Sequence, residues 1–178
     1  MTPCRQKILV KGRKLAFWEL DGSGRWECLL ECVCGHGRAG FSRCKREGDG
    51  CTPVGTFPLE MCFGTGEDPG ALLPYRRIGP DSWWSGERED YNRWAEAAPG
   101  SRDMSSSEHL ADYPLQYKYA MSIGYNTADP EWGAGSAIFL HCIGANGLAT
   151  AGCISVPEPA ALYLATHCGP GALIQIFD

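Results

Sequence analysis

Residues 8–34 read ILVKGRKLAFWELDGSGRWECLLECVC and carry the pattern that decides the fold class. Apolar runs at residues 8–10 and 15–20 flank a Lys-Gly turn, and residues 21–24 form a Gly-containing turn before a third run at residues 26–34. Short apolar runs separated by such turns are typical of antiparallel strands. We therefore predict a three-stranded meander in the first third of the chain.

The rest of the chain supports a mainly β fold in a single domain that spans residues 1–178. The sequence has 178 residues, of which 44% are hydrophobic, and it contains 23 Gly and 12 Pro. This length can bury one sizeable core but is short for two domains, and this Gly and Pro content suits strands joined by tight turns. Further strands are expected through residues 61–63, 117–125, 136–142 and 172–177. One short C-terminal helix is expected at residues 157–166, where prolines are confined to the first turn.

Charge and hydropathy exclude two classes of partner. The chain has 16 Lys and Arg against 21 Asp and Glu, which gives a net charge of −5, so nothing predicts a nucleic-acid partner. The longest apolar stretches, such as residues 137–140, fall far short of the roughly 20 residues that span a bilayer. Residues 1–7 have no apolar segment of a signal peptide, so either a leader was removed or the protein is not exported by that route.

Residues 81–114 interrupt the strand pattern as an irregular or partly helical excursion. Five aromatic residues are scattered there among charged, Ser and Gly residues: Trp83, Trp84, Tyr91, Trp94 and Tyr113. Aromatic side chains on such a segment can line a cleft, or they can form a satellite core that holds the segment down. Both interpretations remain open from sequence.

The ten cysteines and one glycine motif have plain structural interpretations. Cys28, Cys32 and Cys34 share one face of the third predicted strand, where packing is the expected role. Three side chains spread over roughly 13 Å suit one tetrahedral metal ion poorly, so no metal site is predicted. Disulfides remain open for an exported protein. Residues 35–40 match the dinucleotide spacing G-x-G-x-x-G, but no helical pattern follows, so we reject a dinucleotide site.

The candidate catalytic residues lie in two segments, at residues 135–142 and 150–155. The first is a predicted strand that ends in His141 and Cys142, and the second places Cys153 beside Gly152 in a turn. Catalysis by a cysteine needs a thiolate, a base within hydrogen-bond reach and backbone donors for the developing oxyanion. These residues can supply all three. The spacing alone is equally compatible with Cys153 as a small buried core residue.

Several motifs together resemble the L,D-transpeptidase catalytic domain, the YkuD-like family of peptidoglycan-modifying cysteine enzymes. Residues 138–141 (Ile-Phe-Leu-His) followed by Thr150-x-Gly152-Cys153-Ile154 resemble its active-site signature. Residues 45–57 look like the family's Thr-Pro-x-Gly-x-Phe element in a Glu-Gly-Asp branch, in which residues 91–92 and 123–126 also recur. The resemblance covers most of the chain and implies a β-sandwich.

The resemblance also implies roles for individual residues. Cys153 would be the nucleophile, His141 its general base, and the backbone carbonyl of Cys142 would orient the imidazole. The amides of Gly152 and Cys153 would form the oxyanion hole. Substrate contacts are expected from Thr150, which fills a Ser/Thr position of the signature, and from Ser155, Trp84 and Tyr125.

The chain departs from the family pattern beside the nucleophile. Many members have a His and an Arg around this cysteine, where the present sequence has Ala151 and Ser155. If that Arg holds substrate, another cation must replace it, and Lys45 or Arg46 are candidates. The alternative for these two residues is a solvated charge pair.

The expected function is therefore L,D-transpeptidase acyl transfer on a peptidoglycan stem peptide through a Cys153 acyl-enzyme, without a cofactor. Three alternatives remain: an L,D-carboxypeptidase that discharges the same intermediate to water, a non-catalytic murein-binding module, and a purely structural thiol-rich domain. The excursion at residues 81–114 is a candidate lid that would govern access of water. The family implies a location in the cell envelope, and sequence leaves the oligomeric state open.

Overall fold

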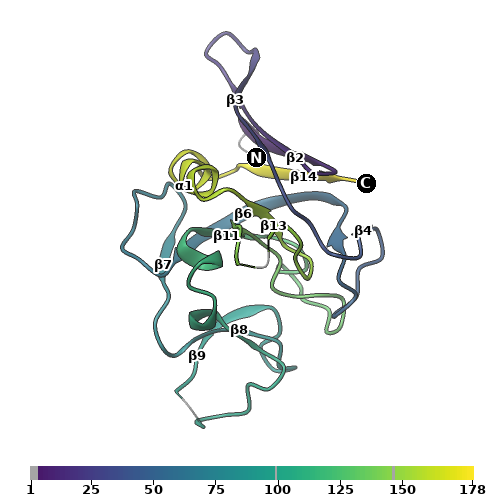
Figure 1. Cartoon of the computed structure of the whole chain (residues 1–178), viewed down its shortest axis with the longest axis vertical. Helices are drawn as coiled ribbons and strands as arrows, with labels where there is room; N and C mark the ends of the chain where they lie inside the picture. The colour runs from purple at the N-terminus through teal and green to yellow at the C-terminus, as the bar shows by residue number, and fades with distance from the viewer. Residues whose placement is uncertain (1–3, 99, 146) are drawn as a thin grey trace.

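The computed structural model describes residues 4–98, 100–145 and 147–178 (Figure 1). It is mainly β, as predicted, with one α-helix. The strands are β1 (Gln6–Lys11), β2 (Lys14–Leu20), β3 (Trp26–Val33), β4 (Phe41–Ser42), β5 (Thr52–Pro53), β6 (Gly55–Gly64), β7 (Tyr75–Arg77), β8 (Ser82–Ser85), β9 (Arg93–Glu96), β10 (Glu108–His109), β11 (Ala120–Ile123), β12 (Phe139–Cys142), β13 (Ile154–Val156) and β14 (Leu173–Phe177). The helices are α1 (Glu158–His167) and two 3-10 turns, η1 (Leu110–Asp112) and η2 (Gln116–Lys118).

Most strands join one large sheet in the order β13-β12-β11-β6-β14-β1-β2-β3, with β7 paired to β6 beside this path. The long strand β6 connects two halves, because residues 55–58 pair with β14 while residues 59–63 pair with β11. Strands β12 and β13 run parallel. The chain must therefore cross from the end of β12 to the start of β13, and residues 143–153 make this crossing.

The main core lies between the two halves of this sheet and helix α1. Buried side chains come from both halves, including Ile8 and Phe17 on one and Leu140 and Ile154 on the other. Helix α1 adds a face of buried side chains spaced at helical intervals: Ala160, Ala161, Leu164 and Ala165. Two apolar faces packed over a shared core make the predicted β-sandwich.

The predicted meander is present and protrudes from the body at the β2–β3 hairpin (Figure 1). Its register shifts between Phe17, which pairs with Leu30, and Trp18, which pairs with Cys28. This bulge reverses the alternation of β3, because one extra residue moves the side chains beyond it to the other face. Cys32 and Cys34 pack on the main core as expected, whereas Cys28 does not belong to that core.

The described part of the excursion at residues 81–114 is irregular and partly helical as predicted, with turns and the 3-10 turn η1, and it also contains a small sheet. Strand β8 is its middle strand and pairs with β9 and β10. The sheet lies at the end of the molecule opposite the protruding hairpin (Figure 1). Its residues close a second core, whose buried members are Phe63, Ile78, Trp84, Leu110, Tyr117, Ala120, Phe139 and Cys153.

Other expected elements shift at their ends. Within the family-like element at residues 45–57, β5 and the start of β6 occupy the second half. The strand predicted at 117–125 begins with η2, and the strand predicted at 136–142 is extended only from Phe139. Ala137 has a φ of +52°, which is incompatible with strand geometry. After residues 35–40 comes β4 rather than a helix, in agreement with the rejected dinucleotide site.

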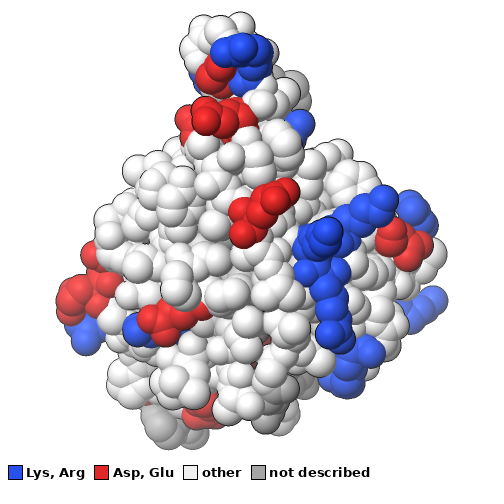
Figure 2. Space-filling model, turned by 45° about the horizontal axis from the view of Figure 1, so that its top comes forward, with Lys and Arg blue, Asp and Glu red and all other residues white. Residues whose placement is uncertain are grey.

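The charged side chains are unevenly placed on the face shown in Figure 2. Lys and Arg gather in a row on the side of the molecule where Figure 1 places β4, whereas the hairpin tip carries both signs. Within the described residues, no helix is long and apolar enough to cross a membrane.

Candidate active site

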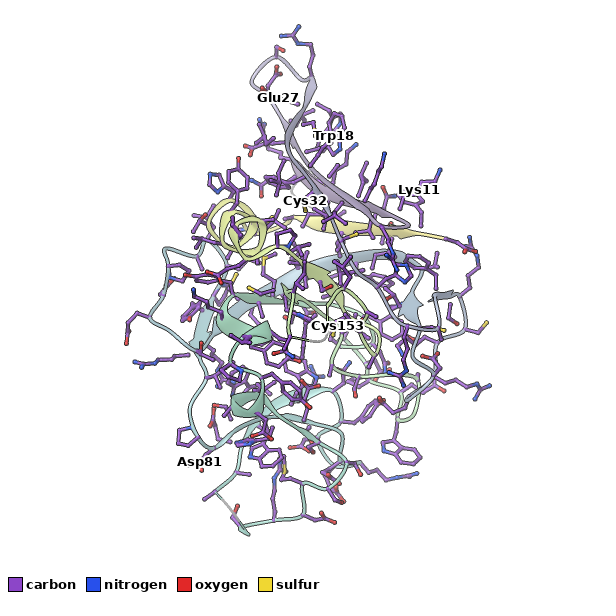
Figure 3. The ribbon with its side chains drawn as sticks, viewed as in Figure 1. Lys11, Trp18, Glu27, Cys32, Asp81 and Cys153 are labelled. Carbon is purple, nitrogen blue, oxygen red and sulfur yellow. The ribbon has the colours of Figure 1, made fainter. Side chains whose placement is uncertain are left out.

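Cys153 is the last residue before β13, near the middle of the molecule (Figure 3). Its Sγ atom lies 3.2 Å from the carbonyl oxygen of Ala137 and 3.4 Å from the amide nitrogen of Phe139. The left-handed backbone of Ala137 directs these groups, because it turns the chain just before β12 begins. The thiol is therefore held by one acceptor and one donor at the edge of the second core.

The turn that presents Cys153 is fixed by two threonine hydroxyls. Thr150 Oγ1 donates to the Cys153 carbonyl at 2.7 Å and accepts from the Gly152 amide at 3.1 Å. Thr52 Oγ1 donates to the Gly152 carbonyl at 2.8 Å and accepts from the Gly37 amide at 2.8 Å. A Cβ at position 152 would lie 2.9 Å from the Cys51 carbonyl oxygen, closer than real Cβ atoms come, so the close approach requires glycine.

The backbone amides of this turn differ in what they can offer a substrate. The Gly152 amide already donates to Thr150, whereas the amides of Ala151 and Cys153 donate to no residue in the described part of the chain. A developing oxyanion needs donors that are free and fixed before the reaction. The Cys153 amide meets this requirement in the present geometry, and the Gly152 amide would first have to leave Thr150.

His141 has a defined tautomer. Its Nδ1 lies 2.8 Å from the Cys142 carbonyl oxygen, which can only accept, so Nδ1 carries the proton and Nε2 is left as an acceptor. Burial lowers the pKa of His141 below its ordinary value of 6.5, although the hydrogen bond to Cys142 opposes this shift. The ring is therefore neutral at neutral pH, and its free nitrogen can take a proton.

The Cys153 thiol is also neutral at rest. Burial raises its pKa to about 12, and the negative charge of Glu108 adds to this increase, while the Phe139 amide and the charge of Lys45 oppose it. A thiol with this pKa becomes a nucleophile only when a base removes its proton during attack. The pair of a neutral thiol and a neutral imidazole with a free Nε2 is suited to such a step.

His141 and Cys153 both line one cavity of about 450 Å³. In the described chain no hydrogen bond joins them, because Sγ is directed at Ala137. The cavity wall is mixed in charge: Arg38, Lys45, Glu47 and Glu108 line it together with Trp84, Tyr113 and Tyr117. Tyr117 packs edge-on against the His141 ring, with 5.6 Å between centroids.

The Glu-Gly-Asp loop borders this cavity and is tied to two distant turns. The Glu47 carboxylate accepts hydrogen bonds from Tyr91 Oη and, at 2.8 Å, from Ser136 Oγ. Asp49 accepts from Lys45 Nζ at 2.7 Å and from the amides of residues 46 and 51. Burial alone would raise the pKa of Asp49, but these hydrogen bonds outweigh it and lower the pKa. The loop therefore holds Lys45 in place at the cavity wall.

The predicted substrate residues divide into two groups. Trp84 and Thr150 line the cavity. Ser155 is buried, donates to the Leu148 carbonyl at 2.7 Å and does not line it, and Tyr125 donates to the Ala134 carbonyl at 2.8 Å away from it. Of the two candidate cations, Lys45 lines the cavity and Arg46 does not. Trp84 also packs on Phe139, with 4.8 Å between centroids, so it both lines the cavity and closes the second core.

Sequence reasoning did not identify Arg38, Glu108 and Tyr117, which also line the cavity. Arg38 lies within the glycine motif at residues 35–40, whose dinucleotide interpretation was rejected, and Glu108 and Tyr117 lie in segments without a recognisable motif. The role of Thr52 was visible only as part of the Thr-Pro element. Among the described residues, no group of three or more His, Cys, Asp or Glu side chains is arranged to hold a metal ion.

Comparison with known proteins adds a family and a set of similar folds. Residues 6–176 match the family described as the L,D-transpeptidase catalytic domain, YkuD. Among solved structures, the helical cell shape determining protein Pgp2 from Campylobacter jejuni is similar at 15% identity, over 97% of this chain and 47% of that chain, with a TM-score of 0.55.

Two mycobacterial structures are also similar. L,D-transpeptidase 1 from Mycobacterium tuberculosis is similar at 13% identity, over 98% of this chain and 62% of that chain, with a TM-score of 0.43. An L,D-transpeptidase from Mycobacterium smegmatis is similar at 12% identity, over 98% of this chain and 59% of that chain, with a TM-score of 0.44. The present chain spans about half the length of Pgp2. A search of curated proteins by sequence found no match.

Proposed function

The chain belongs to the YkuD family of L,D-transpeptidase catalytic domains, and from that premise we propose that it transfers acyl groups of peptidoglycan stem peptides through a Cys153 acyl-enzyme. One observation carries this proposal. His141 donates Nδ1–H to the Cys142 carbonyl at 2.8 Å, which leaves Nε2 as an acceptor in the cavity that Cys153 also lines. A base with a free acceptor beside a thiol is what cysteine acyl transfer requires.

In the proposed reaction, Cys153 Sγ attacks the carbonyl carbon on the L side of an L,D peptide bond, and His141 Nε2 takes the thiol proton. The Cys153 amide donates to the oxyanion of the tetrahedral intermediate. When the intermediate collapses, the carbon–nitrogen bond breaks and His141 returns the proton to the departing D-amino acid. An acceptor amine, or water, then attacks the thioester and regenerates the thiol.

Two finer points belong to the same proposal. We place the chain in the Glu-Gly-Asp branch, which the bonds of Glu47 and Asp49 beside the cavity support. We also propose that it acts in the cell envelope, where peptidoglycan lies.

Trp84 and Thr150 remain proposed substrate contacts. Arg38 is a better candidate than Arg46 for the replacement cation, because Arg38 lines the cavity and forms no ion pair in the described chain.

Residues 81–114 remain a proposed lid. They supply Trp84, Ser106, Ser107, Glu108 and Tyr113 to the cavity wall. Deletion of residues 82–89 would remove β8, the middle strand of the small sheet, and would therefore test folding as well as gating. The partition between hydrolysis and transfer is better tested with single substitutions on the cavity wall.

The test is mass analysis of products after incubation of the protein with a disaccharide tetrapeptide, with Cys153→Ala as the control. Loss of the terminal D-amino acid by the parent alone supports the proposal. Crosslinked dimers then identify a transpeptidase, and free tripeptide identifies a carboxypeptidase. No turnover by a folded, reduced protein that still binds murein would overturn the proposal in favour of a non-catalytic binding module.

A further inference from the structure

Asn92 is a buried side chain whose hydrogen bonds join three separate segments of the chain. Its Oδ1 atom accepts from the Trp84 indole nitrogen at 2.8 Å and from the Ala137 amide at 3.1 Å. Its Nδ2 atom donates to the carbonyls of Tyr125 at 3.0 Å and Asn126 at 2.7 Å. An Asn side chain offers two donor hydrogens and two acceptor lone pairs, so these four bonds use its full capacity.

One of these bonds reaches the residue that holds the nucleophile. Ala137 has a φ of +52°, a left-handed conformation that is unfavourable for a residue with a Cβ. Such a conformation persists only where the surroundings hold it in place. Asn92 Oδ1 accepts from the Ala137 amide, and the Ala137 carbonyl accepts from the Cys153 thiol at 3.2 Å. The two sides of this strained residue therefore connect Asn92 to Cys153.

The same turn also carries the second partner of the thiol. Phe139 follows Ala137 by two residues, and its amide nitrogen lies 3.4 Å from Cys153 Sγ. Burial raises the pKa of Cys153 to about 12, and this hydrogen bond opposes the increase because it stabilises negative charge on the sulfur. If the turn loosened, both partners of the thiol would be displaced together.

Asn126 provides a matched comparison, because it has a similar backbone conformation and no contact with Ala137. Its φ is +54°, against +58° for Asn92. Its side chain also forms hydrogen bonds to the backbone of another loop, at Glu131 and Gly135. In the described part of the chain, none of these bonds involves Ala137. Removal of either Asn side chain should loosen a loop, but only one of them is bonded to the turn that holds the thiol.

We propose that Asn92 is a positioning residue for the nucleophile, because it holds the turn whose carbonyl and amide groups face Cys153 Sγ. This inference rests on the proposed function and names a residue on which the reactivity of the thiol depends. At rest, the thiol donates a hydrogen bond to the Ala137 carbonyl. During attack, His141 takes the thiol proton and the Phe139 amide remains as the donor to the sulfur.

The test measures the S–H stretching band of Cys153 by Raman spectroscopy, as the difference between a protein and the same protein with Cys153→Ala. A hydrogen bond to a carbonyl lowers the wavenumber of this band. Glycine tolerates the left-handed backbone, so Asn92→Gly removes the bond to Ala137 without adding strain, and we expect the band to move towards that of a free thiol. In Asn126→Gly the band should keep its parental position. An unchanged band in folded Asn92→Gly would overturn the inference.

Kinetics with a disaccharide tetrapeptide give a second measurement. Asn92→Gly should lower kcat by about tenfold or more and leave KM within about twofold, because positioning acts on the chemical step. A raised KM with an unchanged kcat would mean that the residue acts on substrate binding, and this result also overturns the inference. If the parent shows no turnover, the proposed function fails, and the Raman band still decides the inference.

Two measurements on the parent keep the inference testable if Asn92→Gly does not fold. The Ala137 amide should exchange its hydrogen slowly, since it is bonded to a buried acceptor. The S–H band of Cys153 should be that of a hydrogen-bonded thiol. Rapid exchange of the Ala137 amide in the folded parent, or the band of a free thiol, would overturn the inference.

Discussion

Cys62 in the main core and Cys153 in the second core are both buried. Comparing them shows that burial and a raised pKa do not by themselves identify a nucleophile. Cys62 lies in the main core, where burial raises its pKa to about 12, as it does for Cys153 in the second core. Cys62 Sγ faces the Ala165 carbonyl of helix α1 among aliphatic side chains. Cys153 shares a cavity with His141, a free amide and a partly satisfied carboxyl group. What distinguishes the two thiols is what lies beside them.

The most direct test of this difference between Cys62 and Cys153 replaces each cysteine by alanine in turn. Cys153→Ala should lower turnover by at least about 10⁴-fold, because the nucleophile is lost. Cys62→Ala should cost about 1 kcal/mol of stability and leave turnover within about twofold. Product formation and denaturant unfolding of both variants measure these effects. Comparable loss of activity in the two variants would refute the distinction.

The cores should also differ in what they contribute to stability. Leu164 is fully buried between α1 and the sheet, so Leu164→Ala should lower the free energy of unfolding by about 2–5 kcal/mol. Because Leu164 does not line the cavity, kcat/KM per folded molecule should stay close to that of the parent. Thermal unfolding combined with active-site titration separates the two quantities. A large loss of kcat/KM in the folded fraction would mean that the main core tunes the site directly.

A smaller effect is expected from the hydroxyl that fixes the nucleophile turn. Thr52→Val keeps the shape of the side chain but leaves the Gly152 carbonyl and the Gly37 amide without a partner, at a cost of about 1–3 kcal/mol. We expect kcat to fall by about tenfold as the turn loosens. Thr52→Ser, which restores the hydroxyl, serves as the control. If Val and Ser variants had the same kcat, the hydroxyl would not position the turn.

The smallest expected effect is on the pH dependence. Burial lowers the pKa of His141 below its ordinary value of 6.5, so most of the base is still neutral at pH 6.5. In the pH profile of kcat/KM, the acid limb should therefore have its midpoint below pH 6.5. The unfolded chain binds the proton more readily, so the contribution of His141 to stability is present above 6.5 and is lost as the pH falls towards the folded pKa. Rate profiles and unfolding at several pH values check both statements. An acid limb at or above pH 6.5 would contradict the lowered pKa of His141.

Sequence predicted many of the strands and the turn that presents Cys153 because their signals are local. Alternation marks β1, β2 and β3, and the pairing of a Gly with Cys153 reports a close approach that only glycine tolerates. The bulge that displaces Cys28 depends on the partner strand, and a periodic pattern cannot show it.

The part of the site that sequence missed depends on long-range packing. Glu108 and Tyr117 form a pair only because β10 pairs with β8 while η2 packs against β12, and neither residue lies in a motif. Ser155 was named as a candidate substrate contact, and in the structure its hydroxyl does not line the cavity. A short polar side chain on a buried strand instead finds the nearest carbonyl, that of Leu148.

The hydrogen bonds that the Thr52 hydroxyl makes to Gly37 and Gly152 also have a consequence for how the protein folds. Thr52 and the Gly152 carbonyl that it holds are 100 residues apart in the chain, and residues 35 and 37 bridge to Ser155 and Thr150. Such contacts close long loops and form late, after local hairpins have been made. The turn that presents Cys153 should therefore be among the last parts of the chain to order. A fragment that contains Cys153 and His141 but lacks the first 55 residues should carry an unreactive thiol, and activity should be a stringent reporter of complete folding.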